Sequence, residues 1–294
     1  MWQPPRGAIL VGVDGSAAAL GAVRWAARDA ALRKAPLALV HVVDAPLPAW
    51  FEGLRGSRKR PARGMLESAI DVARDSTDGC GPVRVESKVL RSALIPTLVD
   101  MSSGVDTVVV GRRGHGGASA RGLLGSVSSA LVYHAQCPVA VIHHQDARSG
   151  TGARAPVLVG IDGSPASEEA TEIAFEQASR RGVGLVALHA WMDPWVSGSK
   201  RPFQDGNWDA RLSEEEETLA ERLAGWHDRY PEVGIHRRIE IGDPARRLLE
   251  ASELAQLLVV GSHGCGRLRG VTLGSVGAAV AAKAKIPVIV ARRP

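Results

Sequence analysis

The stretch that decides the fold is Val259-Val260-Gly261-Ser262-His263-Gly264, followed by nine residues and then Gly274-Ser275. We interpret it as the end of a buried strand, a glycine-rich loop and the start of a helix over 276–284. Glycine permits a tight turn and close backbone approach. Free N–H groups and the positive end of the helix dipole then point into the loop. The pattern favours an anion, most naturally nucleotide phosphates, although such glycines can also serve helix–sheet packing alone.

Length and composition place the chain among globular proteins with room for two domains. It has 294 residues, of which 45% are hydrophobic and 23% charged. Aromatic residues make up only 4%, which argues against a base-stacking surface for single-stranded nucleic acid. The cysteines, Cys80, Cys137 and Cys265, have spacings that indicate neither a disulfide framework nor a zinc site.

The N-terminal segment and the lack of a long apolar run predict a cytoplasmic protein. Residues 1–6 lack the basic segment and long apolar core of a signal peptide, and no apolar run of about 18 residues could span a bilayer.

The net charge is +5. A basic cluster could contact nucleic acid or an acidic partner, but we expect a solvated loop and no nucleic-acid binding. This cluster consists of Arg55, Arg58, Lys59, Arg60 and Arg63.

The chain contains two copies of one unit. Residues 9–16 match 157–164, and further matches follow at nearly the same offset of about 150 residues, the size of a whole domain. The segment 144–154 is polar and glycine-bearing, as a linker should be. The predicted domains are 1–145 and 154–294.

Within each copy, short apolar runs alternate with longer helical segments, which indicates a parallel sheet covered on both faces. Ser16 and Ser164 are candidate helix caps. The strands expected in the first copy are 9–13, 37–43, 83–90, 107–110 and 139–143, and the helices are 17–34, 65–75, 94–101 and 127–134. In the second copy we expect a helix over 214–227 and strands over 235–241 and 288–291.

Chemically useful residues recur at the carboxyl ends of the predicted strands, where ligands of open parallel sheets bind. Each copy therefore has one candidate crevice. The two trios are Asp14, His41 and Gly111 in the first copy, and Asp162, His189 and Gly261 in the second. We expect the two histidines to be hydrogen-bonded and partly buried, and not catalytic bases.

Over essentially its whole length, the chain resembles the universal stress protein family in its tandem, ATP-binding form. The resemblance is carried by the spacing Gly261, Gly264, Gly274-Ser275 and by the aspartates that close the first strand of each copy, Asp14 and Asp162. It implies an α/β fold with two tandem Rossmann-like (adenine nucleotide alpha hydrolase-like) domains. Each would have a five-stranded parallel sheet with helices on both faces.

The resemblance also implies that ATP binds in each copy, or in the second alone, with or without magnesium. In the family, the glycine motif holds the phosphates and ribose, the aspartate contacts adenine and ribose, and the residue after the second-strand histidine lies along the adenine. The first site would comprise Gly12, Asp14, Val42, Val110, Gly111, Gly114, Gly125, Ser126 and Val127. The second would comprise Gly160, Asp162, Ala190, Val260, Gly261, Gly264, Gly274, Ser275 and Val276.

The first copy departs from the family pattern. Ten residues, including Ser119 and Ala120, separate Gly114 from Gly125-Ser126. The extra residue could bulge outward, or it could move the Gly125-Ser126 amides off the phosphates. The first copy also has Ser92-Ala93-Leu94 where the second has Gly242-Asp243-Pro244, the family's usual turn. We therefore expect the second site to be the more reliable one.

Several residues near the loops allow two interpretations. Ser126 and Ser275 could donate to phosphate or cap the following helix, and we expect capping. His115 and His263 could assist charge neutralisation or be bystanders. Cys265 could be a redox-sensitive thiol at a helix N-terminus, but we expect a neutral loop residue.

The sequence predicts a binding protein and not an enzyme. It has no Gly-x4-Gly-Lys-Ser/Thr loop and no carboxylate pair that recurs with the glycine loop. The resemblance implies an ATP-binding regulator of stress survival or growth, whose two domains pair through their last strands and which forms a homodimer. The alternatives are a slow ATPase or phosphotransfer enzyme and a ligand-free interaction module.

Overall fold

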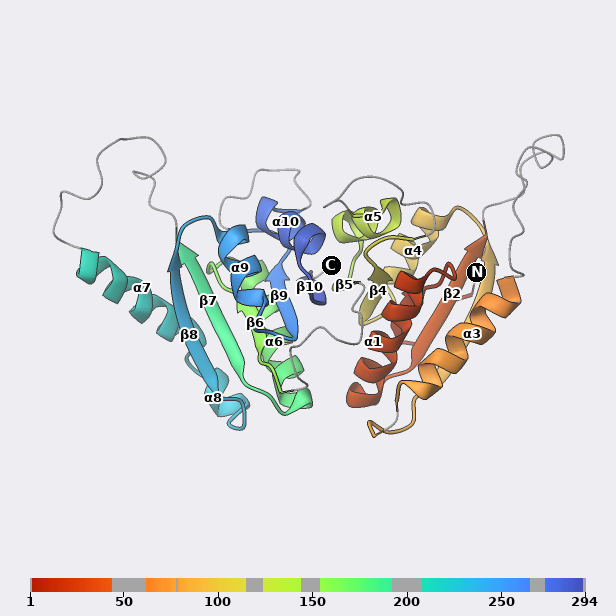
Figure 1. Cartoon of the computed structure of the whole chain (residues 1–294), viewed down its shortest axis with the longest axis horizontal. Coiled ribbons are helices and arrows are strands. Elements are labelled where there is room, and N and C mark those ends of the chain that lie inside the picture. Colours follow the sequence, from red (N-terminus) through yellow and green to blue (C-terminus); the bar gives the residue numbers. More distant parts are fainter. Residues whose placement is uncertain are drawn as a thin grey trace. The chain divides into compact units, whose positions relative to one another are not determined.

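The computed structural model describes residues 2–43, 62–77, 79–114, 124–143, 154–191, 208–264 and 273–292. The chain divides into two compact units, one within Met1–Gln145 and one within Asp146–Arg293. Each unit is a parallel sheet between helices (Figure 1). The predicted α/β fold with two such domains is confirmed. None of the helices in the described ranges is long and apolar enough to cross a membrane.

The first unit has five parallel strands in the order β3-β2-β1-β4-β5. Helix α1 packs with α3, and α4 packs with α5 on the other face of the sheet (Figure 1). The elements are β1 (Ile9–Gly12), α1 (Ala17–Arg33), β2 (Leu37–Val43), α3 (Ala62–Asp75), β3 (Val85–Arg91), α4 (Leu94–Ser102), β4 (Thr107–Gly111), α5 (Ser126–His134) and β5 (Val139–Ile142).

The second unit repeats this order as β8-β7-β6-β9-β10, again with all strands parallel. Its elements are β6 (Val157–Gly160), α6 (Pro165–Arg181), β7 (Leu185–Trp191), α7 (Trp208–Leu223), α8 (Trp226–Arg229), β8 (Ile235–Ile241), α9 (Pro244–Ser252), β9 (Leu257–Gly261), α10 (Ser275–Lys283) and β10 (Val288–Ala291).

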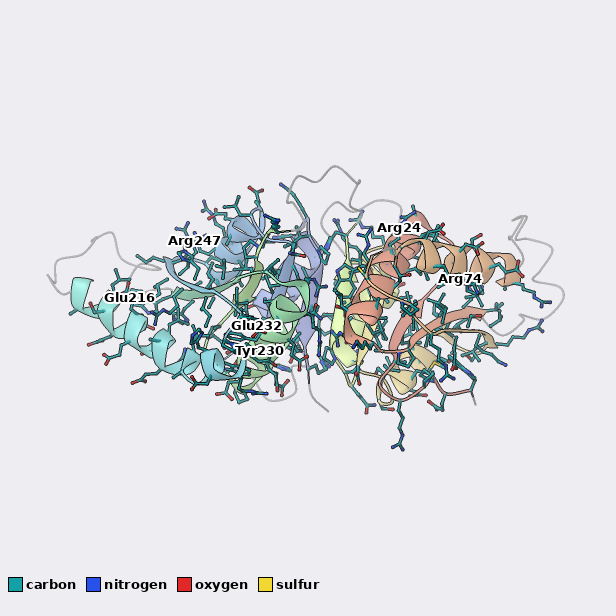
Figure 2. The ribbon with its side chains drawn as sticks, turned by 90° about the horizontal axis from the view of Figure 1, so that it is seen from below. Arg24, Arg74, Glu216, Tyr230, Glu232 and Arg247 are labelled. Atoms are coloured by element: carbon teal, nitrogen blue, oxygen red, sulfur yellow. The ribbon has the colours of Figure 1, made fainter. Side chains whose placement is uncertain are left out.

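The single helix predicted over 214–227 is wrong, because the chain forms two helices there. Gly225 has a φ of 79°, a left-handed conformation that ends one helix and precedes α8. An aromatic cluster holds α8 against α6: the ring of Phe175 stacks on Trp226 at 5.1 Å and on Tyr230 at 5.6 Å. Burial and, secondarily, the nearby Glu176 raise the pKa of Tyr230. Figure 2 labels Tyr230 among the side chains of the second unit.

The first helix of each unit is fixed at its N-terminus by the predicted serine cap. The Ala19 amide donates to Ser16 Oγ over 3.1 Å, and the Ser167 amide donates to Ser164 Oγ over 3.2 Å. Pro165 occupies the first turn of α6, where its missing N–H costs nothing. These caps place the turn before each helix directly beside the central strand.

Helix α1 also contains a buried ion pair. The Nε of Arg33 lies 2.7 Å from Oδ2 of Asp29, and the two side chains are 12% and 0% exposed. The same spacing on α3 joins Arg63 to Glu67 over 3.7 Å, but those side chains are 91% and 68% exposed. The two pairs share geometry and differ in burial, which makes them a matched comparison.

Replacing Asp29 with alanine is expected to destabilise the first unit by about 3 kcal/mol, because Arg33 would remain buried without its partner. Glu67→Ala should change stability by about 0.5 kcal/mol or less. Hydrogen exchange of β1 and β4 peptides, read by mass spectrometry, measures both effects. Equal protection in the two variants would contradict the assigned role of burial.

Candidate functional site

Each unit has a cavity at the carboxyl ends of its strands. The cavity of the first unit has a volume of about 530 Å³ and that of the second about 370 Å³, both within the usual range of small-molecule sites. The structure brings together all nine residues predicted for each site, since every one lines its cavity. The glycine loops, the strand-end aspartates and the helix starts thus converge on one place in each unit.

The strand-end aspartates are held by the turn that follows them. The Ser16 amide donates to Oδ1 of Asp14 over 2.9 Å. In the second unit, the amide and the hydroxyl of Ser164 both donate to Oδ1 of Asp162, over 2.9 and 2.6 Å. One oxygen of each carboxylate therefore fixes the turn.

The other carboxylate oxygen lies against the glycine loop. A Cβ at Gly114 would stand 2.2 Å from Oδ2 of Asp14, and a Cβ at Gly264 would stand 2.6 Å from Oδ2 of Asp162. Both distances are too short for a side chain, so each loop depends on glycine at this position. The second oxygen of each carboxylate thereby lies where the strand-end turn and the glycine loop meet.

The loop also begins with a glycine that close backbone packing requires. A Cβ at Gly111 would lie 2.7 Å from the carbonyl carbon and oxygen of Ala18, and a Cβ at Gly261 would lie 2.8 Å from those of Ala166. Backbone atoms cannot move aside as a flexible side chain can. The ends of β4 and β9 therefore pass the first turns of α1 and α6 at a distance that only glycine allows.

The helices that follow the glycine loops begin without side-chain caps, so the capping predicted for Ser126 and Ser275 is wrong. The N-caps are Gly125 and Gly274, and neither helix has a side-chain cap hydrogen bond. Both serines are instead the first helical residue, whose hydroxyl is badly placed to bond the amides of its own turn. The first-turn amides are left for another acceptor at the edge of the cavity.

Both loops close in the same way despite the extra residue in the first. The Gly125 amide donates to the Arg112 carbonyl over 2.9 Å, and the Gly274 amide donates to the Ser262 carbonyl over 2.7 Å. The first-turn amides are therefore not displaced by the longer loop. Ser119 and Ala120, like His115 and Cys265, lie outside the described residues.

The two units differ at the turn before the fourth helix. In the second unit, Asp243 caps α9 by accepting from the Arg246 amide over 2.7 Å, and Gly242 has a φ of 126°. In the first unit, the N-cap Ala93 makes no side-chain bond. There the turn is bridged instead by Thr97, whose hydroxyl lies 2.7 Å from Ser92 Oγ and donates to the Ala93 carbonyl over 2.7 Å.

The strand-two histidines are hydrogen-bonded structural groups, as predicted. The Nδ1 of His41 lies 2.6 Å from the Val13 carbonyl, and that of His189 lies 2.7 Å from the Ile161 carbonyl. The Nε2 of His189 also lies 3.3 Å from a carboxylate oxygen of Glu215. Each ring ties the second strand to the chain just before the aspartate.

Apolar walls from α4 and α9 were missed by the sequence analysis. Leu94 and Leu98 line the first cavity, and Pro244 and Leu248 line the second. Gly160 makes room for this wall, since a Cβ there would stand 3.1 Å from Leu248. The signal available in the sequence was the four-residue spacing within each pair, which places both residues on one face of the helix.

A basic side chain, arginine or histidine, lies in each glycine loop. Arg113 lines the first cavity, and His263 lines the second. The Nδ1 of His263 lies 2.9 Å from Ser262 Oγ. Among the residues that the structure describes, no cluster of three or more histidine, cysteine or acidic side chains could hold a metal ion. Of the basic cluster at 55–63, only Arg63 is described.

The family model described as the universal stress protein family matches residues 6–143 and again 154–292. The chain belongs to the universal stress protein family. It is 50% identical to "Universal stress protein Rv2623" of Mycobacterium tuberculosis over 289 residues, which cover 97% of this chain and 96% of that protein. A universal stress protein of Mycolicibacterium smegmatis is 46% identical with the same coverage.

A solved structure supports the fold. The crystal structure of a universal stress protein from Archaeoglobus fulgidus matches 98% of both chains with a TM-score of 0.67 at 21% identity. This tandem universal stress protein is therefore similar to its relatives over its full length, in both copies.

Removing the Ser275 hydroxyl is expected to leave the stability of the second unit within about 0.5 kcal/mol, because that hydroxyl makes no cap bond. Ser164→Ala should instead cost about 1 kcal/mol or more, since Ser164 caps α6 and bonds Asp162. Urea unfolding followed by circular dichroism compares the two variants. A larger loss in Ser275→Ala would restore the capping interpretation.

Proposed function

We propose that this universal stress protein binds ATP in both cavities, and that nucleotide occupancy regulates stress survival or growth. The observation that carries the proposal is the convergence, twice in one chain, of a glycine loop, a strand-end carboxylate and an uncapped helix N-terminus on one cavity. Membership of the family supports the regulatory role.

The phosphates would lie against the glycine loop and the start of α5 or α10. There the first-turn amides lack side-chain acceptors, and the helix dipole favours negative charge. The space that a Cβ would occupy at Gly114 or Gly264 is closed by the aspartate. Glycine at these two positions therefore adds no side chain of its own between the loop backbone and the phosphates.

The nucleoside would occupy the rest of each cavity. Asp14 and Asp162 present a carboxylate to the ribose hydroxyls or the adenine amino group, each with one oxygen already fixed by its turn. Apolar side chains such as Leu98 and Leu248 would cover the flat base. A polar end and an apolar wall match the two halves of an adenine nucleotide.

We propose binding without physiological turnover. Among the described lining residues, each cavity offers one carboxylate and no lysine. Phosphoryl transfer needs a positioned nucleophile and charge stabilisation beyond backbone amides. Magnesium would enter with the phosphate oxygens of the nucleotide and keep most of its waters.

Titration calorimetry of ATP against single-site variants tests the proposal. Gly114→Asp and Gly264→Asp should each remove one binding event, because the new side chain collides with an aspartate and adds a like charge beside the phosphates. The double variant should bind none.

Matched controls are Gly64→Asp and Gly234→Asp, where a Cβ meets nothing within 4 Å. Both should keep two sites. Wild-type protein that gives no binding heat with millimolar ATP and no competition with a fluorescent adenine nucleotide would refute the proposal.

We also propose that the two domains pair through β5 and β10 and that the chain forms a homodimer. Each is the last strand of its own sheet and consists of buried apolar residues. An apolar edge left unpaired would invite association with another strand.

The outward amides of β5 and β10 should therefore exchange with solvent as slowly as those of β1, measured by hydrogen exchange and NMR. Sedimentation should give twice the chain mass. Exchange as fast as at the charged outer strands β3 and β8 would exclude the pairing.

A further inference from the structure

We propose that Arg113 makes the first cavity select nucleotides by phosphate charge, whereas the second cavity, with His263 at the matching position, selects less strongly. The inference rests on the proposed nucleotide binding and adds to it a functional difference between the two sites. The chain would then carry a selective triphosphate site and a permissive adenine-nucleotide site.

Arg113 and His263 occupy the same position in the two loops. Each lies between the two loop glycines of its copy, in Gly111-Arg112-Arg113-Gly114 and in Gly261-Ser262-His263-Gly264. Both flanking glycines are fixed in each unit by the close approaches described above. Because both residues also line their cavities, they stand at equivalent points beside the expected phosphates.

The residues lining the two cavities differ in charge at this point. Among the described lining residues, the ionisable ones are Asp14, His41 and Arg113 in the first cavity, and Asp162 and His263 in the second. A guanidinium keeps its charge at every physiological pH, whereas histidine in proteins ordinarily loses its proton near pH 6.5. The first cavity thus has a permanent positive charge at the position where the second cavity has a histidine.

A second arginine lies next to Arg113 in the sequence, although it is not among the described residues that line the cavity. Arg112 precedes Arg113, and the matching residue of the second copy is the uncharged Ser262. Burial and, secondarily, the positive charge of Arg113 lower the pKa of Arg112. Its Nε is buried and has no hydrogen-bond partner among the residues that the structure describes. A bound polyanion in the first cavity would offset the repulsion between these two cations.

This difference in charge affects how strongly each cavity distinguishes nucleotides by their number of phosphates. It does not affect binding of the base. The walls that would hold adenine are similar in the two cavities, with a leucine from α4 or α9 in each. An extra positive charge at the phosphate end therefore favours ATP over AMP without changing the affinity for adenosine. For a partly solvated charge, we expect a difference on the order of tenfold in the ratio of ATP to AMP affinity.

Full-length chains with one site blocked allow each cavity to be measured alone. Gly264→Asp leaves the first site, and Gly114→Asp leaves the second. Affinities for ATP, ADP, AMP and adenosine are measured by calorimetry at about pH 8, where an ordinary histidine is neutral. The first site should show the larger ratio of ATP to AMP affinity.

Reciprocal substitutions then test whether the residue itself is responsible. Arg113→His, in the chain with only the first site, should lower the ratio to that of the second site. His263→Arg, in the chain with only the second site, should raise it by on the order of tenfold. Arg113→Lys, which keeps the charge, should retain the ratio, and adenosine affinity should stay constant throughout.

The outcomes separate the two proposals. Nucleotide binding with equal ratios at both sites, or with ratios that do not follow the substitutions, overturns the role of Arg113 and leaves the proposed function standing. Failure of both single-site chains and of the wild type to bind any adenine nucleotide overturns the proposed function itself.

Discussion

The structure depends on one close approach, made once in each unit. The last residue of β4, Gly111, and of β9, Gly261, lies so near the first turn of the neighbouring helix that a Cβ would overlap backbone atoms. This contact brings the end of one strand to the turn that follows the central strand. The aspartate of that turn, the glycine loop and the helix start then meet around one cavity. A larger residue would have to separate these parts before it affected any ligand.

Duplication preserved this arrangement while the chemistry around it diverged. Both units share the caps of their first helices, the closing bond of the glycine loop and the uncapped helix start. They differ in the turn before the fourth helix and in the cation beside the second loop glycine. The shared features are those that position backbone amides, and the variable ones alter charge and the bonding of that turn. Under the proposed function, the two sites can therefore respond differently to the same nucleotide.

Much of this could be predicted from sequence because backbone requirements leave clear residue patterns. The alternation of strands and helices and the serine caps follow from apolar spacing and residue type, and the residues around each cavity follow from the resemblance to the universal stress protein family. The break at Gly225 was missed because a lone glycine is also tolerated inside a helix. The caps at Ser126 and Ser275 were misjudged by one residue, a shift that helix propensities do not resolve. The leucine walls were missed because they depend on how α4 and α9 pack on the sheet.

The most direct test is a crystal structure of the full chain with ATP. The account predicts triphosphate density in both units, bonded by the amides of Gly125, Ser126, Gly274 and Ser275, with adenine beside the apolar wall. It also predicts that Asp14 and Asp162 keep their turn bonds and contact the nucleoside. Nucleotide bound outside the cavities, or inside them with its phosphates directed away from the helix starts, would contradict the central claim.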